Sequence, residues 1–110
     1  MKKKVKLILL TIILICIIFF SPNFIYKTSD KFFGFPIPIK AKLMKEVNQT
    51  KGYRWWRASE ENGIPADYKI MIKLNGWEKG EQEGACTVYT KENHTVELCS
   101  FNKELYVANR

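Results

Sequence analysis

The apolar residues of the chain are concentrated first in one long run near the N-terminus. This run, broken only by Thr11, extends from Leu7 to Phe20, directly behind lysines at positions 2, 3, 4 and 6. A cleavable secretory signal has an apolar region of roughly 7 to 15 residues and a small-x-small cleavage site, whereas a spanning helix needs roughly 20 apolar residues. No Ala-x-Ala sequence follows before Lys31, and the uncharged stretch continues to Tyr26. The pattern predicts an uncleaved signal anchor over residues 1–26, with secretion after atypical cleavage as the alternative.

The charges around this run predict its orientation. Because lysine-rich flanks stay on the cytoplasmic side, we expect a single-pass protein of the cell membrane with a cytoplasmic N-terminus and an extracytoplasmic C-terminal domain. The membrane is then a predicted partner, with Tyr26 at its interface. Lipidation at Cys16 is not expected, because the preceding residue is Ile15 rather than a small residue.

Proline and glycine mark the segment that follows. The string DKFFGFPIPIK contains Gly34, Pro36 and Pro38, which forbid a regular helix and favour an extended spacer. We therefore predict a Pro-containing linker over residues 27–40 and a small domain over residues 41–110.

Two strands are predicted at the start of this domain. Residues 41–47 alternate weakly between apolar and polar, and the string GYRWWRA at 52–58 is rich in aromatic strand formers. Residues 48–51 between them resemble a turn. The two strands are therefore expected to form a hairpin.

The segment from 65 to 75 carries two competing patterns. Tyr68, Ile70, Ile72 and Leu74 alternate as in a strand. Pro65 suits a first helical position, however, and the ending Asn75-Gly76-Trp77 resembles a glycine C-cap followed by a hydrophobic residue that packs back. We predict a helix from about Pro65 to Asn75, with the strand as the alternative.

Further strands are predicted near 85–90, 94–101 and 105–108, after a polar bend at 78–84. The expected fold class is therefore α+β: an N-terminal transmembrane helix, then a small domain with one helix packed on an antiparallel sheet of about four to five strands.

Several strings in this layout carry a resemblance. FGFPIPIKAKL, ASEENGIP, NGWEKGEQEGA and TVYTKENHTVEL are similar to small membrane-anchored or secreted proteins of unknown function from Bacillus-type bacteria. The resemblance covers roughly residues 33–100. It implies a Pro-rich entry, a hairpin, a helix ending in Gly-Trp and further strands, and it implies no catalytic residues.

The formal net charge of +7 does not indicate a nucleic-acid-binding protein. Four of the 18 basic residues precede the apolar run, which leaves 14 basic against 11 acidic residues, a net charge of +3 for the rest of the chain. No basic run there is longer than a pair. Nucleic acid is therefore not expected as a partner.

Cys86 and Cys99 are spaced for a disulfide across a hairpin. If Glu92 and Asn93 form a two-residue turn, pairing 91 with 94 and continuing outward brings Cys86 opposite Cys99 at a non-hydrogen-bonded site. A disulfide with its Cα atoms roughly 5.5 Å apart fits this position. Two free thiols or a redox pair are the alternatives, although a cross-strand pair lacks the C-x-x-C spacing of a redox couple.

No residue pattern indicates catalysis, and no metal or cofactor site is predicted. His94, the single histidine, falls near the tip of this hairpin, where a solvated turn residue is expected rather than a catalytic base. No His or carboxylate has zinc-ligand spacing, and no G-x-S-x-G or Walker sequence is present. We therefore do not expect an enzyme.

Arg54, Trp55, Trp56 and Arg57 form the predicted binding surface. On a strand the two tryptophans would face opposite sides, so one could join the core while the other serves as a binding anchor. The favoured hypothesis is a non-enzymatic interaction module that binds an unknown protein or an envelope polymer. An accessory subunit of a larger membrane complex is the second hypothesis, and a thiol enzyme using Cys86 and Cys99 is the third.

Overall fold

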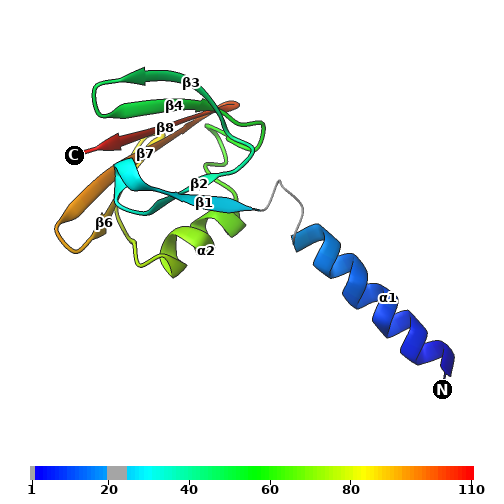
Figure 1. Ribbon diagram of the computed structural model, residues 1–110. Coiled ribbons are helices and arrows are strands. Elements are labelled where there is room, and N and C mark those ends of the chain that lie inside the picture. The colour runs from blue at the N-terminus through cyan, green and yellow to red at the C-terminus, as the bar shows by residue number, and fades with distance from the viewer. Residues whose placement is uncertain (1, 20–24) are drawn as a thin grey trace.

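The computed structural model describes residues 2–19 and 25–110 (Figure 1). The first element is helix α1, Lys2–Phe19. No helix in these two ranges is long and apolar enough to cross a membrane. This finding corrects the prediction of a single-pass anchor and of a cell-membrane location. The physical reason is that four of the 18 residues of α1 are lysines, and the predicted span also counted residues 20–24, which lie outside the described ranges.

The segment assigned to a linker from the sequence forms a hairpin. Strand β1, Tyr26–Ser29, pairs with strand β2, Phe35–Pro38, and a 3-10 helix η2, Asp30–Phe32, lies between them. Phe33 and Gly34 have positive φ values of 56° and 86°, which reverse the chain. All four residues of β2 are buried. The hairpin is therefore part of the domain, and Tyr26 pairs with Pro38 instead of marking a bilayer interface.

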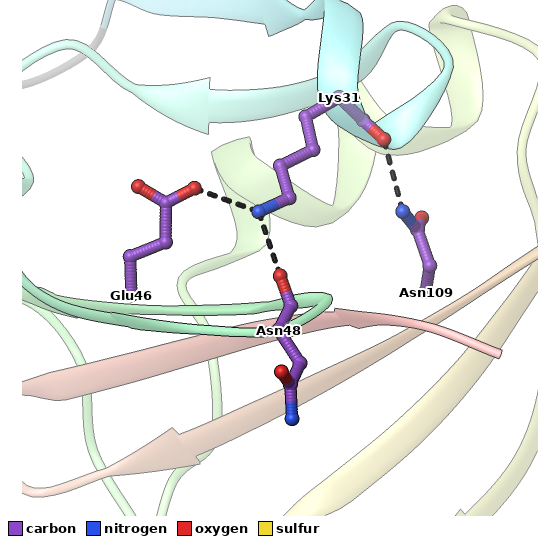
Figure 2. Close-up of polar contacts among 4 residues, drawn as sticks. All are labelled: Lys31, Glu46, Asn48 and Asn109. Atoms are coloured by element: carbon purple, nitrogen blue, oxygen red, sulfur yellow. Dashed lines mark hydrogen bonds and ion pairs between the residues drawn. The ribbon is translucent and has the colours of Figure 1, made fainter.

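Hydrogen bonds of Lys31 connect this hairpin to a second, six-stranded sheet, which is the main sheet of the domain (Figure 2). Its Nζ donates hydrogen bonds to Glu46 Oε1 at 2.7 Å and to the carbonyl oxygen of Asn48 at 3.0 Å. Its own carbonyl oxygen accepts a bond from Asn109 Nδ2 at 3.0 Å. The hydrogen bond from Lys31 lowers the pKa of Glu46 below its ordinary value.

The main sheet has six strands in the order β3-β4-β8-β7-β6-β5, with antiparallel neighbours throughout. The strands are β3 Lys42–Val47, β4 Thr50–Arg54, β5 Glu78–Glu83, β6 Cys86–Lys91, β7 His94–Phe101 and β8 Glu104–Asn109. This corrects the predicted fold class, because residues 2–19 and 25–110 form two sheets, of two and six strands, instead of a transmembrane helix and one sheet of four to five strands. Strand β5, predicted as a bend, has the sequence EKGEQE, which is exposed throughout and has no apolar residue to indicate a strand.

The predicted helix is present as α2, Ala66–Leu74. Its C-terminal end is closed by two backbone hydrogen bonds, from Gly76 N to Lys73 O at 3.0 Å and from Trp77 N to Ile72 O at 3.2 Å. Gly76 has a φ of 90°. These features form a Schellman motif, in which the residue after the glycine packs back on the helix, and Trp77 is accordingly 1% exposed.

The core lies on one face of the six-stranded sheet. Alternate residues of the strands, including Tyr53, Leu105, Val96 and Tyr89, are buried in one cluster with side chains of the β1–β2 hairpin and α2. Both of these elements lie on that side of the sheet (Figure 1). The intervening strand residues form the opposite face, which we call the outer face.

Candidate functional site

The four residues of the predicted binding surface do not form one exposed surface. Arg54 ends β4 and is exposed, whereas Trp55 is 1% exposed and packs edge-to-face on Tyr68 with ring centroids 5.5 Å apart. Trp56 is 64% exposed. Arg57 is half-buried and pairs with a carboxylate of α2. The surface as a binding site stays a prediction, and Trp56 is the residue whose exposure best fits it.

Arg57 belongs to a polar network that connects three parts of the fold. Its Nη1 and Nη2 donate to the two oxygens of Asp67 at 2.9 and 2.6 Å, and the hydroxyl of Tyr26 donates to Asp67 Oδ2 at 2.6 Å. Burial opposes ionisation of Asp67, but these hydrogen bonds outweigh it and hold the pKa of the carboxyl below its ordinary value. Burial, together with the bond to Asp67, raises the pKa of Tyr26.

Replacing Asp67 with asparagine should therefore destabilise the domain in a pH-dependent way. We expect a loss of about 1–2 kcal/mol at pH 7, because the half-buried Arg57 loses its bidentate partner. A lowered folded-state pKa stabilises the protein above the unfolded-state value of about 4, and this contribution disappears as the pH falls through the folded value. Urea unfolding of both proteins from pH 7 to pH 2 checks this. A difference that stays constant below pH 3 would contradict the role of the carboxylate.

The predicted disulfide between Cys86 and Cys99 is confirmed. The two residues face each other on β6 and β7, with Lys91 opposite His94 at the turn, and their Cα atoms are 4.0 Å apart. This distance is shorter than the expected 5.5 Å because a non-hydrogen-bonded pair brings the strands closest together. Glu97 lies beside the bridge, and in the described residues these three form the one group placed to hold a metal. The two bonded sulfurs are not available as thiolate ligands.

His94 lies at the start of β7, one residue beyond the predicted turn. Its ring stacks on Phe33, with centroids 3.7 Å apart and planes inclined by 13°. The imidazole therefore contributes to the contact between this hairpin and the turn that follows η2.

A groove between α2 and β5 combines positive charge with an apolar floor. It has a volume of about 470 Å³. Its floor includes Ile72, Trp77 and Tyr89, and the flanking residues are Lys69, Lys73, Glu78 and Lys79. The indole Nε1–H of Trp77 is buried and has no hydrogen-bond acceptor among the described residues. The sequence contained one signal for this groove, the spacing of Lys69 and Lys73, which places both on one side of a helix.

The comparisons with known proteins do not provide a functional assignment for this chain. No family model, curated protein or solved structure matches the chain. The resemblance of residues 33–100 to small proteins of Bacillus-type bacteria therefore stays a prediction from the sequence.

The groove has the chemistry of a binding site for an anion that carries an apolar part. Ligand pockets are commonly 300–1,000 Å³ in volume, with apolar walls and a few polar groups that fix orientation. Three ammonium groups at the border attract an anion, and the aromatic and aliphatic floor accepts an apolar portion.

Proposed function

We propose that this chain is a non-enzymatic binding module whose ligand site is the groove between α2 and β5. The observation that carries the proposal is the placement of Lys69, Lys73 and Lys79 around a floor of buried apolar side chains. The ligand class is an anionic group, carboxylate or phosphate, attached to an apolar portion. Such a group is presented equally well by a small molecule and by an acidic segment of a partner protein.

The separation of the lysines on two elements supports this proposal. Lys69 and Lys73 are four residues apart on α2, and Lys79 reaches the same groove from β5. Exposed lysines on one helix are often only a solvated surface. Lysines on two elements that border the same apolar hollow instead converge on a shared space, so their fields add at a bound anion. Glu78 at the border would select against ligands with a large negative charge.

Binding of 1-naphthyl phosphate tests the site. We expect binding to shift the indole Nε1–H resonance of Trp77 in proton–nitrogen NMR spectra of the full chain, with the signal identified by its loss in Trp77→Phe. 1-Naphthylmethylammonium has a similar apolar part and the opposite charge, and inorganic phosphate has the charge alone. Both should bind at least about tenfold more weakly, since each lacks one of the two interactions.

Charge reversal in the groove provides the matched variants. Lys69→Glu with Lys73→Glu should raise the Kd for 1-naphthyl phosphate by about tenfold or more, because two attractive charges become repulsive. Lys45→Glu makes the same kind of change on the outer face of the sheet and should leave this Kd unchanged. Equal affinity for the cationic and anionic naphthyl compounds, or equal effects of the groove and control variants, would refute the assignment.

A further inference from the structure

The outer face of the six-stranded sheet has an apolar and aromatic centre. Tyr106 and Phe101 pack edge-to-face with ring centroids 5.7 Å apart, and the Cys86–Cys99 disulfide lies on the same face. Gly52 leaves the space that the Tyr106 ring occupies, because a Cβ there would lie 2.7 Å from Tyr106 Cε1. The β1–β2 hairpin and α2 pack on the other side of the sheet, so neither of them covers this centre.

The charges of the outer face are separated toward its two edges. On the β3 edge, a hollow of about 350 Å³ is lined by Lys45, Val47, Gly52 and Tyr106, among others. On the β5 edge, a hollow of about 200 Å³ is lined by residues that include Glu81, Glu83 and Val88. The same hollow is also lined by Glu97 and Arg110, which pair with each other at 2.9 Å, so its net negative charge comes from Glu81 and Glu83. One edge is therefore basic and the other acidic.

The strand pairing places the two charged edges in register. Successive partners across the sheet form one row: Lys45, Gly52, Tyr106, Cys99, Cys86 and Glu83. The middle of this row lies between β8 and β7, which are also the two central strands. Lys45 and Glu83 are thus equally far from the centre, on opposite sides.

We infer that two copies of this chain pair through their outer faces about a two-fold axis that runs along the strands between β7 and β8. This axis reverses the strand order of the second copy, so Lys45 of each copy lies over Glu83 of the other and each basic hollow faces an acidic one. A two-fold axis across the strands would place the basic edges over each other. Charge therefore selects the first arrangement, and the resulting contact is closed and isologous.

The dimensions of the face set the expected strength of the dimer. Six strands spaced by about 4.8 Å and about 20 Å long present roughly 500 Å² on each copy. This is less than the roughly 800 Å² per partner of a standard interface. We therefore expect a dimer that dissociates in the micromolar range and weakens as salt screens the edge charges.

Charge reversal at the two ends of the row tests the pairing. Sedimentation velocity of the full chain in a non-ionic detergent, which keeps α1 dispersed, should show a monomer–dimer equilibrium between about 5 and 500 µM. Lys45→Glu alone and Glu83→Lys alone should each raise the dimer Kd by about tenfold or more, because each variant opposes like charges at both ends of the interface. Lys69→Glu, on the groove side, is the control and should leave the Kd unchanged.

Mixing the two weakened variants provides the decisive observation. At one end of the mixed dimer, the glutamate introduced at position 45 would face the lysine introduced at position 83. At the other end, the unchanged Glu83 of one copy would face the unchanged Lys45 of the other, so both ends become complementary again. We expect the mixture to dimerise with a Kd close to that of the natural chain, although each variant alone does not. A monomer throughout the concentration range, equal dimerisation of all variants, or no recovery on mixing would each overturn the inference. None of these outcomes bears on ligand binding in the groove.

Discussion

Replacing Trp55 with alanine is expected to lower the free energy of unfolding by about 3–5 kcal/mol. The side chain is 1% exposed and contacts Tyr68 and Tyr26 edge-to-face, with centroids 5.5 and 6.3 Å away. Alanine would leave a cavity beside these two aromatic rings, at the point where β4, α2 and β1 meet. For a domain with a typical stability of about 5–15 kcal/mol, this is a large fraction of the total. Urea unfolding followed by circular dichroism measures the loss.

Two further substitutions separate packing from hydrogen bonding at this position. Trp55→Phe should cost clearly less than Trp55→Ala, because phenylalanine keeps most of the volume and removes an indole N–H that has no acceptor among the described residues. Trp56→Ala, one residue along the chain, should change stability by no more than about 0.5 kcal/mol, since that side chain is 64% exposed. Similar losses for the two alanine variants would show that the assignment of Trp55 alone to the core is wrong.

The elements that the sequence predicted correctly are those with local signals. Glu92 and Asn93 form the turn of a hairpin with eight-residue and six-residue strands, and the resulting register alone places Cys86 opposite Cys99. The helix at 66–74 was indicated by its flanking proline and glycine, although its alternating residues also suited a strand. In both places the turn or cap chemistry is contained within a few residues, so no knowledge of the rest of the fold is needed.

The elements that the sequence failed to predict depend on distant partners. Pro36 and Pro38 cannot donate backbone hydrogen bonds, yet they fit a two-stranded ribbon because its free side needs no donors. Strand β5 is held by pairing with β6, and its charged residues suit an exposed sheet edge. Neither segment has the apolar alternation that marks a half-buried strand.

The candidate groove and the charge separation of the outer face both arise from strand order. The chain enters the sheet at β3 and reaches β5 only after α2, yet the strand order places these two at opposite edges. Lys79 of β5 therefore borders the same groove as the two lysines of α2. Glu83 lies at the opposite end from Lys45 of the row of paired residues that crosses the sheet. Spacing along the sequence carries no information about these pairings.

Removing the disulfide is expected to lower the free energy of unfolding by about 3 kcal/mol. The bond closes a loop with a sequence separation of 13 residues, and constraining a loop of this size in the unfolded chain stabilises the folded state by about that amount. The two proteins compared are the Cys16→Ser variant, which keeps the disulfide, and the same variant with Cys86→Ala and Cys99→Ala added. Cys16 is replaced in both because it is a free, exposed thiol. Urea unfolding at pH 7 gives the difference.

Reductant supplies the control for this measurement. Dithiothreitol should move the unfolding midpoint of the protein that retains both cysteines toward that of the double-alanine variant, and it should leave the variant itself unchanged. Cys99 is buried on β7, between β6 and β8, so any loss beyond the reductant effect measures the packing of the sulfur atoms on the outer face. If reductant has no effect on the midpoint, the bond contributes no net stability and the hairpin is held by its turn and its strand pairing alone.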